Sequence, residues 1–129
     1  MYTVYYIVNM ETRNAFGNYI RERREALRAN DPQFSVRQVA RRIGVQPSYL
    51  SKVERGETSV PSEATILRLA EELDEDPDVL LALAGKVSSE LQAVIRNRPK
   101  LFAELIRSLK DQSDHAVLRI VREVRDGNW

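Results

Sequence analysis

Residues 35–56 read SVRQVARRIGVQPSYLSKVERG, and this stretch predicts two short helices joined by a tight turn. Ser35 and Gln38 have the spacing of a capping box at the start of the first helix, in which each side chain binds the other residue's backbone N–H. Gly44 follows the last apolar residue of that helix, where glycine adopts a left-handed conformation without steric cost. Pro47 is predicted as the first residue of the second helix, because proline loses no hydrogen bond there.

The apolar residues of this stretch recur on one face of each predicted helix. Val39, Ala40 and Ile43 share a face of the first helix, and Leu50 and Val53 share a face of the second. The second helix, with Gln46 at its N-cap, turns these polar side chains outward: Gln46, Ser48, Tyr49, Ser51 and Lys52. Two short helices with one exposed polar face fit a DNA-reading element.

These residues and their spacing resemble the Cro/repressor-type helix-turn-helix family, often called the xenobiotic-response-element type. The resemblance rests on the small Ala40, on the Ile-Gly-Val turn at residues 43–45 and on the Glu-Arg-Gly ending at residues 54–56. It extends over roughly residues 14–84, a little over half of the chain. The connection before the motif, residues 29–34, is a few residues longer than is usual in the family.

The fold class that this resemblance implies is all-α, with a five-helix lambda-repressor-like DNA-binding domain at residues 14–85. Besides the two motif helices, amphipathic spacing and capping residues predict helices at residues 15–29, 62–73 and 77–84. The acidic run within residues 71–76 is interpreted as a solvated face turned away from phosphate.

The resemblance also implies a structural pair between Arg24 and Glu54. Within the family, an arginine on the first helix pairs with a glutamate at the end of the second motif helix. A partly buried pair of this kind fixes the recognition helix more than it adds stability. The alternative is a solvated charged face with no partner.

Carried over position by position, the family's DNA-contacting residues fall on and around the second motif helix. The expected base-reading residues are Gln46, Pro47, Ser48 and Lys52. Glutamine can bind adenine through two hydrogen bonds, lysine can donate to guanine, and proline can contact a thymine methyl group. Contacts to phosphate, which position the domain without reading sequence, are expected from Arg37, Arg41, Arg42, Tyr49, Ser51, Arg55 and Thr58. For each residue alone, the alternative is a solvated polar side chain.

Composition argues against the other classes of function. The chain has no cysteine and a single histidine, His115, so disulfides, metal sites and a Ser–His catalytic pair are not expected. It has no Gly-rich phosphate loop and no convergent carboxylates, so neither catalysis nor a cofactor is expected. No apolar run reaches transmembrane length, so a cytoplasmic location is expected. Residues 1–60 carry a net charge of +4 and residues 61–87 one of −5, which gives the N-terminal half a modest DNA-binding footprint.

The N-terminal tail, residues 1–13, opens with the apolar sequence MYTVYYIVN, which does not resemble a signal peptide. Three interpretations remain for residues 1–9. They are an extra strand that pairs across a dimer, a disordered tail, or upstream sequence included by an early start, since Met10 opens a more ordinary N-terminus.

Residues 86–129 predict about three amphipathic helices, which exceed what the five-helix domain requires. So short a region cannot bury three apolar faces within itself, so we expect a helical dimerisation region. The expected dimer contacts are Leu101, Phe102, Leu105, Ile106, Leu109, Val117, Ile120, Val121 and Val124.

The function expected from these observations is sequence-specific transcription regulation. A homodimeric repressor would bind double-stranded DNA at a pseudo-palindromic operator through a recognition helix at about residues 46–55. Two alternatives give the C-terminal helices another partner: an antitoxin whose helices bind a toxin, and a repressor whose C-terminal region is cut by a metallopeptidase, within or near residues 105–107. A pure protein-interaction module is the remaining alternative.

Overall fold

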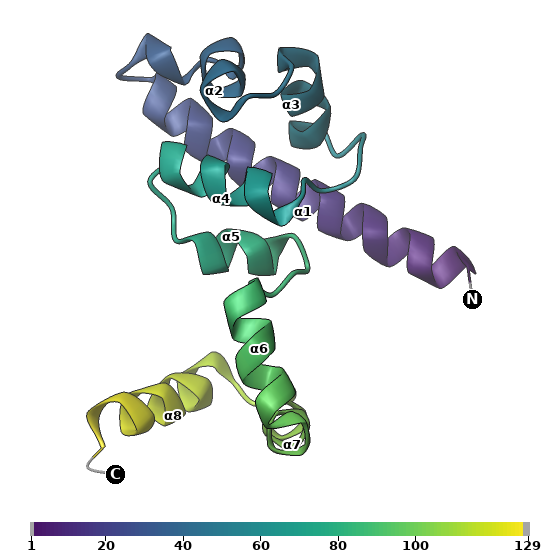
Figure 1. The fold of residues 1–129 in the computed structure, drawn as a ribbon, viewed down its shortest axis with the longest axis vertical. Helices are drawn as coiled ribbons and strands as arrows, with labels where there is room; N and C mark the ends of the chain where they lie inside the picture. The colour runs from purple at the N-terminus through teal and green to yellow at the C-terminus, as the bar shows by residue number, and fades with distance from the viewer. Residues whose placement is uncertain (1, 128–129) are drawn as a thin grey trace. The chain divides into compact units, whose positions relative to one another are not determined.

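The computed structural model describes the backbone of residues 2–127 and the side chains of residues 10–127. These residues form eight α-helices and one short 3-10 helix, with no strand, so the fold is all-α as predicted (Figure 1). They divide into two compact units, the first ending at Ser88 and the second beginning at Ser89. Within the described part of the chain, no helix is long and apolar enough to cross a membrane.

The first unit is built around one long helix. Its elements are α1 (Tyr2–Arg28), η1 (Pro32–Phe34), α2 (Val36–Ile43), α3 (Pro47–Glu54), α4 (Glu63–Glu72) and α5 (Pro77–Leu83). Helix α1 contacts η1, α3 and α5, and α4 lies between the α2–α3 pair and α5 (Figure 1). The short η1 helix occupies the connection that is longer than usual, where the Asp31 carboxylate accepts a hydrogen bond from the Gln33 N–H.

Helix α1 starts earlier than predicted, and it includes residues that were considered as an extra strand. The helix begins at Tyr2 rather than near Ala15, so the extra strand considered for residues 1–9 is wrong for residues 2–9. Met1 lies outside the described residues. The β-branched and aromatic residues suggested a strand, but intrinsic propensity is a weak preference, and an existing helix extends by one hydrogen bond for each residue added.

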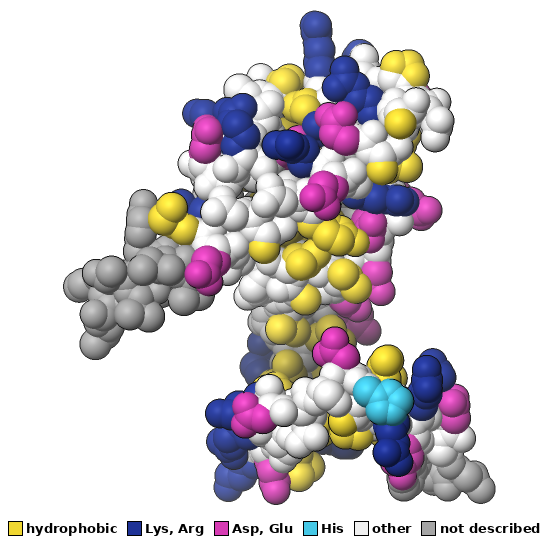
Figure 2. All heavy atoms as spheres, turned by 180° about the vertical axis from the view of Figure 1, so that it is seen from behind, with side chains coloured by type: hydrophobic (Ala, Val, Ile, Leu, Met, Phe, Trp, Pro, Cys, Tyr) yellow, Lys and Arg dark blue, Asp and Glu magenta, His cyan; other side chains and the backbone are white. Residues whose placement is uncertain are grey.

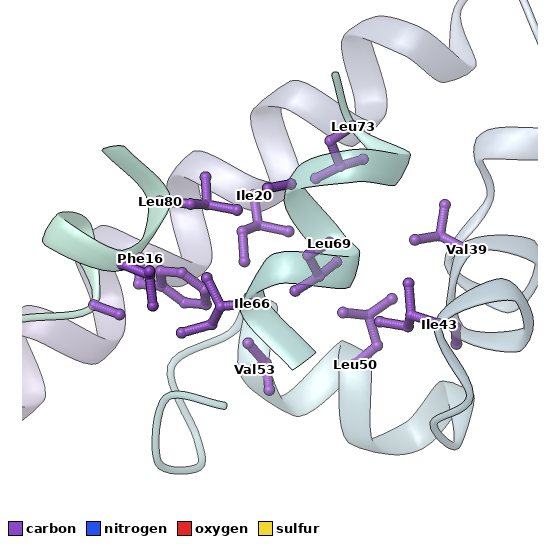
Figure 3. Packing of buried hydrophobic residues seen from close by; sticks show 14 residues of the cluster. Phe16, Ile20, Val39, Ile43, Leu50, Val53, Ile66, Leu69, Leu73 and Leu80 are labelled. Atoms are coloured by element: carbon purple, nitrogen blue, oxygen red, sulfur yellow. The ribbon is translucent and has the colours of Figure 1, made fainter. Parts of the chain in front are cut away.

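One hydrophobic core holds the five helices of the first unit together (Figure 3). Every inward-facing position predicted for α2 and α3 is buried. The labelled side chains are at most 2% exposed and come from all five helices: Phe16, Ile20, Val39, Ile43, Leu50, Val53, Ile66, Leu69, Leu73 and Leu80. Burial of each such side chain contributes about 1.5–3 kcal/mol relative to its exposed state, so this core is the main source of the unit's stability.

The ends of the motif helices follow the local signals with one exception. Gly44 has φ 77°, the left-handed conformation predicted for the turn, and Pro47 is the first residue of α3. Ser35 Oγ accepts a hydrogen bond from the backbone N–H of Gln38 at 3.2 Å. The reciprocal half of the capping box is wrong, because η1 brings the Pro32 carbonyl within 3.3 Å of the Ser35 N–H, which donates to it.

The acidic run at residues 71–76 is only partly the solvated face that was predicted. Glu72 accepts a hydrogen bond from Arg42 at 2.6 Å. Glu75 accepts one from the Tyr19 hydroxyl at 3.0 Å and pairs with Arg23 at 3.2 Å. The hydrogen bond to Glu75 is the main cause that raises the pKa of Tyr19. These carboxylates are paired because the end of α4 packs beside α1 and α2, which sequence spacing alone does not reveal.

The second unit contains α6 (Ser89–Asn97), α7 (Pro99–Leu109) and α8 (Asp114–Asp126). Ser113 caps α8 by accepting a hydrogen bond from the Ala116 N–H at 3.2 Å. None of the residues in these three helices is buried, and Leu101 and Val124 are each 63% exposed. On the face seen in Figure 2, hydrophobic side chains of this unit lie open among charged ones. The unit therefore has apolar surface without a core of its own.

Candidate nucleic-acid interface

The exposed end of α3 is its N-terminus. Gln46, Pro47 and Ser48 are exposed there, and Lys52 is exposed one turn further along. Leu50 and Val53, at 1% and 2% exposure, anchor the opposite face of the same helix in the core. The structure therefore leaves all four predicted base-reading residues accessible, three at the N-terminal end of α3 and Lys52 on the face turned away from the core.

Three predicted phosphate contacts are only half exposed. Tyr49 packs against the hydrophobic core, so its ring has a structural role as well as an accessible edge. Ser51 on α3 and Thr58 in the loop after it are of intermediate exposure. Hydroxyl groups of these residues can act as short-range donors to an anion where they are accessible.

The basic side chains of α2 are divided between solvent and internal contacts. Arg37 and Arg41 are exposed. Arg42 is also exposed, but it donates to Glu72 and lies over the ring of Phe34, with 5.3 Å between its guanidinium carbon and the ring centroid. A cation at this distance from an aromatic face is attracted to it. Arg42 therefore connects α2 to α4 and η1, whereas Arg37 and Arg41 are available to a partner.

Arg55 is paired with a nearby acidic side chain. Its Nε and a terminal nitrogen donate to the two oxygens of Glu57, at 2.9 and 3.2 Å, and both side chains are about half exposed. Hydrogen bonding to Glu57 raises the pKa of Arg55, and the same bonds lower the pKa of Glu57. Arg55 is thus already bound to the Glu57 carboxylate, and a phosphate group must compete with this carboxylate for the donors of Arg55.

The structure brings Arg24 and Glu54 together in a buried pair. Arg24 Nε donates to Glu54 Oε2 at 2.7 Å and a terminal nitrogen donates to Oε1 at 2.8 Å, a two-bond geometry with fixed orientation. The two residues are 2% and 4% exposed. The hydrogen bond to Glu54 is the main cause that raises the pKa of Arg24. The remaining terminal nitrogen of Arg24 donates to the Phe34 carbonyl at 3.1 Å, so one side chain joins α1, α3 and η1.

Arg68 is a contributor to the motif that sequence reasoning missed. It lies on α4, and a terminal nitrogen donates to the Ile43 carbonyl at 3.2 Å, at the C-terminal end of α2. Backbone carbonyls at a helix end have no partner within the helix, so this bond stabilises the turn before α3. No sequence signal predicts this hydrogen bond, because its acceptor is a backbone carbonyl, which every residue type has.

His115, the single histidine of the chain, is exposed at the start of α8. Within residues 10–127, no group of three or more His, Cys, Asp or Glu side chains is placed to hold a metal ion.

The part of the chain that forms this buried core and accessible helix end matches a known protein family. A family model described as a helix-turn-helix domain matches residues 15–83, more than half of the chain. The chain belongs to this helix-turn-helix family. The helix-turn-helix resemblance predicted from residues 35–56 is thereby confirmed. No curated protein and no solved structure matches the chain significantly.

The match locates the helix-turn-helix domain within the first unit. It begins inside α1 and ends at the last residue of α5, so it contains the core except Ala84, together with the Arg24–Glu54 pair and the accessible end of α3. A helix-turn-helix domain indicates a DNA-binding regulator. The second unit lies outside the matched residues.

Proposed function

We propose that this helix-turn-helix protein is a sequence-specific transcription regulator, and that it acts as a homodimeric repressor. The observation that carries the proposal is the accessible N-terminal end of α3, held in place from its buried side and flanked by exposed arginines. In this docking geometry the second helix of the motif enters the major groove, where the first turns of the helix reach base edges.

The proposed roles follow from how accessible each side chain is. Gln46, Pro47, Ser48 and Lys52 read bases. Contacts to phosphate come from Arg37, Arg41 and Arg55, together with the hydroxyl groups of Tyr49, Ser51 and Thr58. Arg42 is bound to Glu72 through its Nε, so a phosphate group must compete with that carboxylate, and the first role of Arg42 is to orient α2. Phosphate contacts supply affinity that falls as salt rises, whereas base contacts supply sequence preference.

We assign residues 14–85 to DNA binding and residues 86–129 to dimerisation. Nine large apolar side chains of α6–α8 are exposed, whereas α1, α4 and α5 expose one each among the described side chains: Met10, Leu67 and Val79. These three residues are scattered, so they offer little apolar surface against which the nine side chains of α6–α8 could pack. A second copy of α6–α8 supplies an apolar surface of equal size, and a two-fold symmetric dimer is the form in which such domains read two half-sites about one helical turn, roughly 34 Å, apart.

Selection from random DNA tests this proposal directly. The wild-type chain is incubated with random-sequence duplexes of about 30 base pairs, long enough for two half-sites one turn apart. We expect enrichment of a two-fold symmetric sequence, and binding that weakens steeply between low and moderate salt. Equal recovery of all sequences at every salt concentration would contradict a sequence-specific regulator.

Replacing Gln46 or Lys52 with alanine is expected to weaken binding to the enriched duplex by about 1–3 kcal/mol per lost base contact. The preference should relax at one base position only. Titrations against duplexes with single base changes measure this effect. Arg37→Ala is the matched control, because loss of a phosphate contact should weaken binding to all duplexes equally and reduce the salt slope by about 1. A uniform loss in the Gln46 or Lys52 variants would rule out their base-reading roles.

Replacing Glu57 with glutamine is expected to strengthen DNA binding. Loss of the carboxylate frees the donors of Arg55 and removes a negative charge beside the proposed phosphate contacts. The salt slope should become steeper by about 1, because Arg55 can then neutralise one more phosphate. Binding at several salt concentrations measures both effects. Glu71→Gln, at an exposed position on α4, is the control for a change in total charge alone. Equal gains in the two variants would show that the Arg55–Glu57 pair is irrelevant to binding.

A further inference from the structure

The backbone conformation at Gly17 does not explain why this residue is a glycine. Gly44, Gly56 and Gly85 have positive φ, which explains a glycine at each of these positions. Gly17 instead lies within α1, where glycine weakens a helix relative to alanine. A reason for a glycine here must therefore come from what the residue touches.

The C-terminal end of α3 lies directly against Gly17. A Cβ atom at this position would lie 2.7 Å from the carbonyl oxygen of Glu54 and closer still to that of Val53. Both contacts are shorter than those that Cβ atoms make in proteins. The obstructing atoms are backbone atoms, which cannot rotate away as the end of a long side chain can. The two helices therefore meet backbone to backbone, and only glycine permits this separation.

The same end of α3 contacts α1 at two further positions. The Glu54 carboxylate is held by Arg24, two turns along α1, so α1 fixes both the side chain and the backbone of this residue. On the other side of Gly17, the Asn14 side chain lies beside Gly56, just after α3. Asn14, Gly17 and Arg24 are spaced by three and seven residues and so share one face of α1. We call these three residues the α3 seat.

We propose that Gly17 is a positioning residue for the recognition helix: its missing side chain sets how closely α3 approaches α1, and thereby where Gln46, Pro47 and Ser48 are presented. Helix α3 has eight residues and is about 12 Å long. A tilt of about 10° at the seat therefore moves its N-terminal end by about 2 Å. Hydrogen bonds to bases do not tolerate such a shift, whereas long arginine side chains adjust to phosphate.

The inference rests on the proposed DNA-binding function, and it predicts that sequence preference, rather than general affinity, responds to Gly17. In the full chain, Gly17→Ala is compared with Asn18→Ala, an exposed neighbour on α1 that lies off the seat. The first readout is the ratio of affinities for the enriched duplex and a scrambled duplex, well below each variant's unfolding temperature. The second readout, taken without DNA, is the orientation of α3 relative to α1 from NMR residual dipolar couplings.

We expect Gly17→Ala to lower the affinity ratio about tenfold or more, equivalent to the loss of one base contact, and to change the orientation of α3. Binding to scrambled DNA and the salt slope should remain as in the wild type, and Asn18→Ala should leave both readouts unchanged. A folded Gly17→Ala variant with wild-type ratio and orientation would overturn the proposal.

Two further outcomes keep the test decisive. If Gly17→Ala does not fold, Asn14→Ala at the exposed edge of the seat replaces it, and an unchanged ratio and orientation would then overturn the proposal. If the wild type itself shows no sequence preference, the proposed function fails. A reorientation of α3 in Gly17→Ala would still support the seat in that case, because the orientation is measured without DNA.

Discussion

Removing either partner of the Arg24–Glu54 pair is expected to lower the free energy of unfolding by about 3–5 kcal/mol. Both side chains are almost fully buried, so Arg24→Met leaves the Glu54 carboxylate without its partner inside the first unit, and Glu54→Leu leaves Arg24 with only Glu25 and the Phe34 carbonyl as acceptors. Arg24→Met also leaves the Phe34 carbonyl without this donor. Urea unfolding followed by circular dichroism measures both variants.

The double variant Arg24→Met/Glu54→Leu separates the loss of a partner from the value of the pair itself. With neither charge left in the interior, much of the stability lost in the single variants should return, since apolar residues of similar volume often replace a buried pair at little cost. Arg55→Met, in the exposed pair with Glu57, is the matched control and should change stability little. Strictly additive losses in the double variant would mean that the two side chains act independently.

Ending the chain after Ser88 is expected to produce a monomer that binds the enriched duplex about 10²–10⁴-fold more weakly. The truncated chain keeps the whole buried core and the accessible end of α3, so each copy can still bind one half-site. The second binding event is no longer intramolecular, and its high effective concentration is lost. Light scattering gives the mass of each chain, and DNA titration at one salt concentration gives the affinity.

Point variants in the second unit test the same interface without a deletion. Val124→Gln changes an apolar residue that is 63% exposed, whereas Arg125→Gln changes its exposed neighbour on α8. Only the first should weaken dimers. A truncated chain that remains dimeric would place the interface in the first unit. A full-length chain that is monomeric alone would favour the alternatives in which α6–α8 meet a toxin or a metallopeptidase.

The parts of the fold predicted from sequence are those that local chemistry determines. Ser35, Gly44 and Pro47 mark the ends of α2 and α3, because capping and turn conformations depend on single residues. Apolar spacing of three and four residues identified the buried faces, because a helix returns to the same side at that period. The start of α1 carries no such capping signal, so the prediction began the helix too late.

Contacts between distant elements account for most of what sequence reasoning missed. The Arg68 bond to the Ile43 carbonyl and the Arg24 bond to the Phe34 carbonyl join segments whose spatial relation appears only after folding. The pairing of Glu72 and Glu75 with residues of α1 and α2 has the same origin. Gly17 was missed because a glycine within a helix signals only lower helix stability until its neighbour is known.

The position of the core along the chain has a consequence for synthesis. The last buried residue of the core is Ala84, and none of the residues of α6–α8 is buried. Because domains fold as units from the N-terminus while the chain is being made, the first unit can reach its native state as soon as this residue has left the ribosome. Folding of the first unit therefore does not need α6–α8, whereas pairing depends on the concentration of chains that carry these helices.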